Sequence, residues 1–173
     1  MEIFFFVLGG LVLVVLFWYV ATRNSIVRAE IKISEAESGI DIALTKRYDM
    51  LTKLLDITKG YAKHEAETLE KVVNLRKGMT IRERSAENAK MDDMFRQLNI
   101  LVENYPNLKA SENFRQLQHT IMDVEEHLQA ARRLFNGNVT IYNNLLVTFP
   151  SSIVANSMGK VKKEYFEAGA AKK

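Results

Sequence analysis

The chain has 173 residues, with 24 Lys and Arg against 21 Asp and Glu, a formal net charge of +3, and no cysteine. The lack of cysteine excludes disulfides and thiolate metal sites. The positive excess is too small and too dispersed to predict a nucleic-acid-binding surface.

The first element is an uncharged run of 19 residues from Ile3 to Ala21. At about 1.5 Å per residue, a helix of this length spans roughly the hydrocarbon core of a bilayer. Aromatic residues at its end suit the headgroup layer. We therefore predict an uncleaved, single-pass membrane anchor over residues 1–23. Its membrane-facing residues include Ile3, Phe4, Phe5, Phe6, Leu11, Leu16, Trp18 and Tyr19.

Basic residues follow the anchor and predict its orientation. Arg23, Arg28 and Lys32 lie just beyond the run, and the positive-inside rule then places the N-terminus outside and the C-terminal domain in the cytoplasm. The alternatives are the reverse orientation and a cleaved secretory signal. A signal needs a positive segment before its apolar core, whereas Glu2 is the only charged side chain ahead of this one.

Helical periodicity continues directly from the anchor. Apolar residues such as Ile33, Ile40 and Leu44 recur at helical spacing, with only Gly39 to weaken the helix. We predict one helix from about residue 3 to Lys59, on the order of 85 Å long, with Gly60 as its stop. With no flexible linker, we expect membrane and domain to move together.

A second helix is predicted from near His64 to about residue 103, with a kink or short break between Gly78 and Ser85. A turn is expected at Tyr105–Pro106, because the residue before proline is disfavoured in a helix.

The third helix has the clearest pattern. Ser111 is predicted to cap it, and it is expected to end at Phe149–Pro150. Asn138 is expected on its apolar seam, where a buried polar residue can fix register. The apolar members of this coiled-coil-like seam are Phe114, Leu117, Ile121, Val124, Leu128, Ala131, Phe135, Tyr142 and Leu145.

A short last helix is predicted after Pro150, with Ser151 and Ser152 as its caps. Its apolar face is a possible interaction face, made by Val154, Met158, Val161 and Tyr165. We favour packing of this face on the bundle over contact with lipid or with a neighbouring subunit.

Together these elements predict an all-α protein, in which residues 24–173 form one domain. The N-terminal transmembrane helix continues into an antiparallel up-and-down bundle of three long helices plus a short C-terminal one. Strands are disfavoured because no alternating run occurs outside the anchor.

Candidate chemistry is sparse. His119, Asp123 and His127 have the i, i+4, i+8 spacing of a one-face metal site, but all three lie outside the predicted seam, which favours a solvated surface. His64-Glu65 begins like a zinc-protease motif, yet Thr68 stands where the second histidine is needed. We predict no catalytic residues, no cofactor and no metal.

Two pairs of basic residues lie on helices. Lys46-Arg47 and Arg132-Arg133 can pair with Asp41, Asp49 or Glu125 of other helices. We favour such structural ion pairs over anion-binding sites.

Several short motifs then stand in a recognisable order. They are Arg23-Asn24, Ile40-Asp41-Ile42-Ala43-Leu44, Lys46-Arg47-Tyr48-Asp49, Lys59-Gly60-Tyr61, His64-Glu65, Thr68-Leu69-Glu70, Tyr105-Pro106, Leu108-Lys109-Ala110, Asn113-Phe114, Leu117-Gln118, Ala131-Arg132-Arg133, Phe135-Asn136, Tyr142-Asn143 and Phe149-Pro150. As an ordered set they closely resemble the bacterial LemA family across nearly the whole chain. One departure is Glu37, where the family often has tryptophan. The resemblance implies a helical-bundle domain on an N-terminal membrane helix, with no established enzymatic activity.

The expected function is therefore a non-enzymatic scaffold or interaction protein at the bacterial inner (cytoplasmic) membrane. Its expected partners are the lipid bilayer and either further copies of itself, as a homo-oligomer, or other membrane proteins. No nucleic acid and no small-molecule substrate is expected. The alternative is a ligand- or metal-sensing bundle that signals through its membrane anchor.

Overall fold

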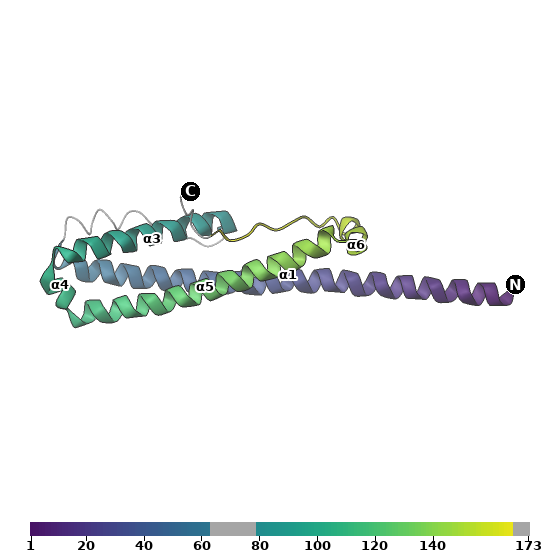
Figure 1. The fold of residues 1–173 in the computed structure, drawn as a ribbon, viewed down its shortest axis with the longest axis horizontal. Helices are drawn as coiled ribbons and strands as arrows, with labels where there is room; N and C mark the ends of the chain where they lie inside the picture. Colours follow the sequence, from purple (N-terminus) through teal and green to yellow (C-terminus); the bar gives the residue numbers. More distant parts are fainter. Residues whose placement is uncertain (63–78, 168–173) are drawn as a thin grey trace. The chain divides into compact units, whose positions relative to one another are not determined.

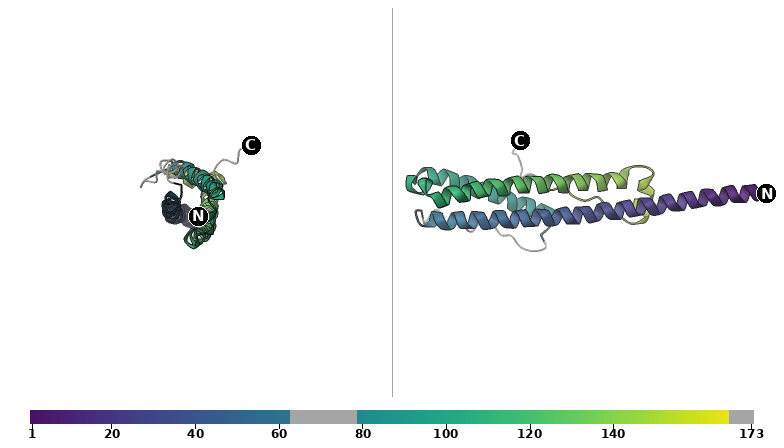
Figure 2. Two further views of the ribbon diagram at one scale, coloured as in Figure 1. Left: turned by 90° about the vertical axis from the view of Figure 1, so that its left-hand side faces the viewer. Right: turned by 90° about the horizontal axis from the view of Figure 1, so that it is seen from below.

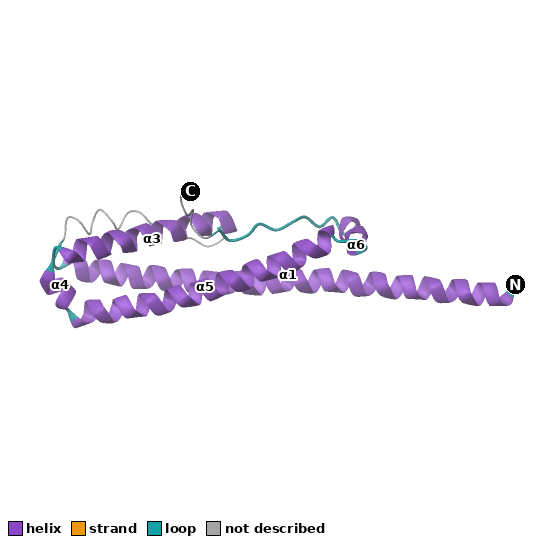
Figure 3. Ribbon diagram, viewed as in Figure 1, coloured by secondary structure: helices purple, strands orange, loops and turns teal. Residues whose placement is uncertain are grey.

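A computed structural model describes residues 1–62 and 79–167, and every regular element in these ranges is a helix (Figure 1, Figure 3). The elements are α1 (Glu2–Lys59), α3 (Ile81–Glu103), α4 (Pro106–Ala110), α5 (Glu112–Val147) and α6 (Ser151–Ser157). The all-α prediction is confirmed.

The chain divides into two compact units, and both draw on α1 and α5. Met1–Glu35 and Asn136–Lys163 form the first, which we call the anchor unit. The second, the bundle unit, consists of Ala36–Phe135 and Glu164–Lys173.

Helix α1 runs without a break from the anchor into the stripe predicted after it. Its buried face begins at Ile26 and continues through Ile33, Ile40 and Leu44 at spacings of seven, seven and four residues. The helix ends at Lys59, where Gly60 N–H donates to the Ile57 carbonyl at 3.2 Å. The predicted stop is therefore confirmed, whereas the predicted helix start near His64 lies outside the described residues.

Helix α3 begins inside the segment where a kink or break was predicted. Thr80 Oγ1 accepts from Glu83 N–H at 3.2 Å, while Glu83 Oε2 accepts from Thr80 N–H at 2.7 Å. This reciprocal capping box satisfies two backbone donors and makes residue 81 a true helix start. Helix α3 therefore has an N-terminus of its own within this segment, at Ile81.

Within the bundle unit, α3 runs parallel to α1, which differs from the predicted up-and-down order, where the second long helix runs antiparallel to the first. Glu37 and Asp41 contact Arg84 near the start of α3, and Arg47 contacts Asp92 further along it. Because contacts advance in the same direction on both helices, their chain directions agree, as Figure 1 shows. Helix α5 runs the opposite way, antiparallel to both.

The turn at Tyr105–Pro106 is confirmed, but it opens a helical turn that sequence analysis missed. Pro106 occupies the first position of α4, where its missing N–H costs no hydrogen bond. Leu108 on this short helix is fully buried. Helix α5 then begins at Glu112, directly after Ser111 as predicted.

The buried seam of α5 departs from the prediction in its second half. After Phe135 the buried apolar residues of α5 are Val139, Tyr142 and Leu146, while Asn138 and Leu145 are only half-buried. A straight helix of 3.6 residues per turn drifts from a strict heptad. The core-facing positions therefore move one residue along, and Asn138 instead donates to the Lys32 carbonyl of α1 at 2.9 Å.

The predicted last helix is too long by two turns. Helix α6 stops at Ser157, because Gly159 adopts a left-handed φ of +63°. The Gly159 N–H donates to the Asn156 carbonyl, and the Lys160 N–H donates to the Ala155 carbonyl. These two bonds form a Schellman motif, which ends the helix. Pro150, and neither Ser151 nor Ser152, occupies the N-cap, without a side-chain cap bond.

The expected apolar face of the last helix is consequently wrong. Val154 is buried and Met158 half-buried, but Val161 and Tyr165 belong to the extended segment after the helix and are exposed. Figure 3 shows this segment as a loop. The four residues do not share one helix face.

Candidate functional site

The anchor segment presents apolar side chains on every side. All described side chains from residue 1 to 17 are exposed, and none of the most apolar window of α1 is buried against protein. A water-soluble helix does not leave 17 consecutive, mostly apolar side chains in solvent. The segment therefore fits a membrane anchor, with Trp18 half-buried at its end.

A polar cluster in the anchor unit joins α1 to the segment after α6. Glu30 accepts from Lys160 at 2.5 Å and lies 3.8 Å from the Lys163 ammonium. Asn143 on α5 bonds the Lys163 backbone in both directions, at 2.9 and 3.0 Å. These contacts hold the extended segment in place without secondary structure of its own.

Two side chains that interact with Glu30 in this cluster, Tyr142 and Lys160, have raised pKa values. Burial, and after it the Glu30 charge, raises the pKa of Tyr142, while Lys160 opposes the shift. The hydrogen bond that the Lys160 ammonium donates to Glu30 raises the pKa of Lys160, against a smaller opposing effect of desolvation. Both shifts favour the protonated form of the group concerned.

In the bundle unit, Arg47 is the centre of a buried polar cluster. Its guanidinium donates to Asn88 and Asp92 at 2.5 Å each and lies 3.0 Å from Glu125. The Arg47 side chain is 4% exposed, so one buried cation of α1 contacts polar groups of both α3 and α5. The predicted Arg47–Glu125 ion pair is confirmed.

A second arginine, Arg84 of α3, contacts α1 about two to three turns before Arg47. Its guanidinium donates to Glu37 and lies 2.7 Å from the Asp41 carboxylate. Asp41 therefore pairs with Arg84, which sequence analysis had not singled out. Glu37 contacts the same arginine.

The other predicted arginine pair makes a different contact. The Arg132 guanidinium stacks over the Phe166 ring at 5.7 Å, a cation–π contact that links α5 to the C-terminal segment of the bundle unit.

The three metal candidates lie apart from these clusters. His119, Asp123 and His127 are all exposed on α5. Among residues 1–62 and 79–167, no three His, Cys, Asp or Glu side chains are grouped as metal ligands. The geometry adds no support to the metal-sensing alternative.

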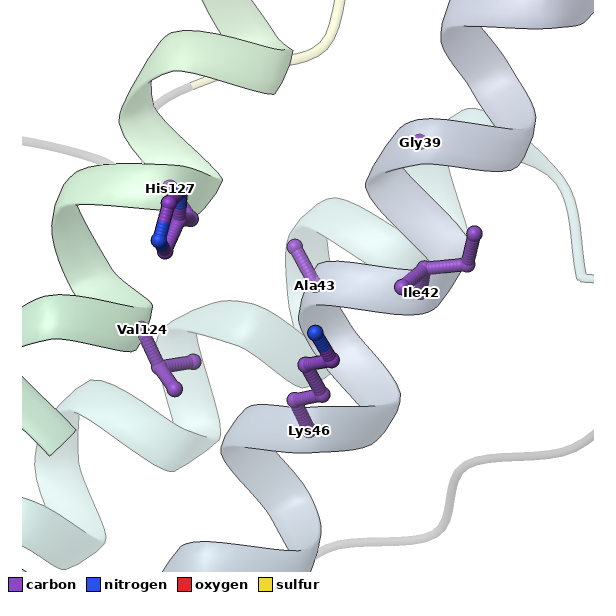
Figure 4. Close-up of a pocket in the computed structure, with 6 residues that line it drawn as sticks. All are labelled: Gly39, Ile42, Ala43, Lys46, Val124 and His127. Carbon is purple, nitrogen blue, oxygen red and sulfur yellow. The ribbon is translucent and has the colours of Figure 1, made fainter. Parts of the chain in front are cut away.

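His127 does line a small pocket of the bundle unit with Lys46 (Figure 4). The remaining walls are Gly39, Ile42, Ala43 and Val124. The pocket encloses about 250 Å³, below the roughly 300–1,000 Å³ of typical small-molecule sites. Its two polar side chains, Lys46 and His127, are both basic.

The chain is similar in sequence to a known protein family. The sequence profile of the LemA family matches residues 36–173. The chain belongs to the LemA family. Protein LemA of Metamycoplasma hominis is 30% identical over 174 residues, which cover 96% of this chain and 80% of that protein.

A second relative is the magnetosome protein MamQ of Magnetospirillum gryphiswaldense. It is 26% identical over 70 residues, which cover 40% of this chain and 26% of MamQ. The LemA family is not known for an enzymatic activity. Together with the apolar helix, this membership makes the chain a membrane-associated LemA-family protein.

Three features escaped sequence analysis for different reasons. The stop at Gly159 has a signal, since a glycine just after a short apolar segment is a frequent helix C-cap residue. The Arg84 cluster has none, because its partners lie more than 40 residues away in the sequence. The Asn143–Lys163 contact involves backbone, which the side-chain pattern does not report.

Proposed function

We propose that the chain is a non-enzymatic, membrane-anchored interaction protein that self-associates at the bacterial inner membrane. The proposal includes the orientation with the N-terminus outside and the helical domain in the cytoplasm. The carrying observation is an exposed apolar stripe on α1 that continues past the anchor into water.

The stripe consists of Val20, Val27 and Ile31, which are seven and four residues apart and so share one helix face. Ile31 is 52% exposed, and Val27 is exposed beside it. The buried stripe of the same segment, Ile26 and Ala29, packs within the protein. An apolar face left over after folding supports contact with a second helix.

A second copy of α1 is a suitable partner for this face. Anchors in one membrane are parallel, so the same stripe of two copies lies at the same depth. Confinement to the bilayer plane also raises the effective concentration of the second copy. We therefore expect a parallel α1–α1 contact just outside the bilayer, on the side of the helical domain.

The test uses single-cysteine variants, because the natural chain has no cysteine. Val27→Cys and Ile31→Cys should form disulfide-linked dimers on oxidation in membranes. Lys32→Cys is the matched control, since it is exposed on another face of the same helical turns. Equal cross-linking at Lys32 would show random collision instead of a specific face.

Light scattering of detergent-solubilised chain gives an independent check. The natural chain should run as an oligomer, and Val27→Asp with Ile31→Asp should reduce its mass. A natural chain that runs as a monomer under mild detergent contradicts self-association.

A further inference from the structure

The corner between α5 and α6 exposes large apolar side chains. Phe149 is 78% exposed, Ile153 57% and Val147 54%, within seven residues of one another. Beside them, Val154 and Ala155 of α6 are buried in the anchor unit. The corner is thus apolar on the side that packs on protein and also on the side that faces out.

Contacts within the anchor unit give the depth of this corner. Asn138 of α5 bonds Lys32 of α1 at 2.9 Å, and the two helices are antiparallel. Because both rise about 1.5 Å per residue, Val147, nine residues further along α5, is about level with Arg23, nine residues earlier on α1. Phe149 follows at the level where the uncharged run ends.

A second contact confirms this level independently. The hydroxyls of Tyr19 and Ser157 are hydrogen-bonded at 3.3 Å, which places the end of α6 beside the last turns of the anchor. Figures 1 and 2 show α6 beside α1 from different directions. Trp18 and Tyr19 are the residue types of the headgroup layer, so α6 lies at that layer too.

We propose that the α5–α6 corner inserts Phe149 and Ile153 into the interfacial layer of the bilayer that the anchor crosses. Lipid is the occupant because the exposed corner is continuous, at the same depth, with the apolar surface of the anchor. Amphipathic elements at this layer bury their apolar side chains about 5–10 Å below the headgroups. Arg23 and Arg28, both exposed nearby on α1, suit anionic headgroups.

The inference rests on the membrane anchor of the proposed function. The depth of fluorescent labels in the bilayer tests the corner and the anchor separately. Full-length Phe149→Cys and Ile153→Cys variants are labelled with an environment-sensitive fluorophore and reconstituted in vesicles of neutral and anionic phospholipid. Leu11→Cys reports the anchor. Ile141→Cys is the matched control, because Ile141 is an exposed isoleucine of α5 about two turns before the corner.

Labels at 149 and 153 should show blue-shifted emission and quenching by brominated lipid chains, weaker than at residue 11. The label at 141 should be quenched by water-soluble iodide instead. If residue 11 is lipid-quenched but 149 and 153 respond like 141, the corner does not enter the bilayer and the anchor stands. If residue 11 also fails, the anchor itself is wrong.

One further outcome would also overturn the inference. Labels at 149 and 153 that are shielded from both quenchers, and that brighten when labelled chain is diluted with unlabelled chain, would show that a second copy covers the corner.

Discussion

At the scale of single residues, two glycines show that backbone conformation, and not only free space, limits substitution by alanine. Gly137 lies inside α5, and a Cβ at that position would meet no atom within 4 Å. Gly159 also has open space, but its φ of +63° is a conformation that other residues adopt only with strain. The same substitution should therefore have opposite effects at the two positions.

Gly137→Ala should stabilise the protein by about 0.5–1 kcal/mol, because it lowers the entropy of the unfolded chain. Gly159→Ala should destabilise it by about 1 kcal/mol through left-handed strain. Thermal unfolding in detergent, followed by circular dichroism, measures both. An equal shift for the two variants would mean that the Gly159 backbone does not need the left-handed conformation.

Alkaline pH should weaken the anchor unit. The folded pKa values of Tyr142 and Lys160 are raised above 10.0 and 10.5, their unfolded values, so folding binds more protons there. The stabilisation is complete below pH 10 and is lost as pH rises through the folded values. The unfolding temperature should therefore fall above pH 10.

Glu30→Gln is the test variant, because Glu30 raises the pKa of both groups. Its unfolding temperature should depend less steeply on pH between 10 and 11.5 than that of the natural chain. The part of the Tyr142 shift due to burial should persist. Parallel curves for the two proteins would refute the role of Glu30.

At the scale of elements, two arginines link the helices of the bundle unit. Arg47 and Arg84 each use the fork of the guanidinium to hold groups that lie on another helix. A planar guanidinium can satisfy two acceptors at fixed angles, whereas an ammonium acts as a point charge. These clusters therefore define which helices meet, and in which direction.

Arg47→Lys should destabilise the bundle by about 1–3 kcal/mol, since at least one buried acceptor loses its donor. Arg47→Met should cost more, because it also leaves the Asp92 and Glu125 charges without their cation. Lys46→Met is the matched neighbour, exposed on the same helix, and should change stability by less than about 0.5 kcal/mol. Denaturant unfolding of all three variants decides the ranking.

The capping box of α3 makes a separate prediction. Thr80→Ala removes the hydroxyl that accepts from Glu83 N–H, and should cost about 1 kcal/mol. Thr80→Ser keeps an acceptor and should retain most of the stability. If serine and alanine behave alike, the hydroxyl does not cap the helix. Chemical denaturation of the two variants checks this.

At the scale of the whole molecule, the chain combines an apolar anchor with exposed apolar faces of the anchor unit. Both the α1 stripe and the α5–α6 corner lie close to the level at which the uncharged run of α1 ends. The proposed function and the further inference assign them different occupants, a second copy and lipid. Their separate single-cysteine tests keep these assignments distinguishable.

Orientation in the membrane is testable with the same chemistry. In intact bacterial cells, a membrane-impermeant maleimide should label Glu2→Cys from outside. Ile100→Cys, exposed on α3, should react only after lysis. The opposite pattern would contradict the positive-inside assignment that rests on Arg23, Arg28 and Lys32.

Elements whose signals are local could be predicted from the amino-acid order. The anchor follows from an uncharged run, the end of α1 from Gly60, and the start of α5 from the residues after Ser111. Hydrophobic periodicity and chain-breaking residues act within a few positions, so one sequence is enough to detect them. Family membership was likewise evident from short ordered motifs.

The folded structure was needed for every feature that depends on residues distant in the sequence. It set the parallel course of α3 beside α1 and the pairing of Arg84 with Asp41. It also moved the buried seam to Val139 and brought the α5–α6 corner to the depth of Tyr19. Packing and long-range hydrogen bonds select among faces that local propensity leaves equivalent, which is why sequence periodicity alone could not reveal them.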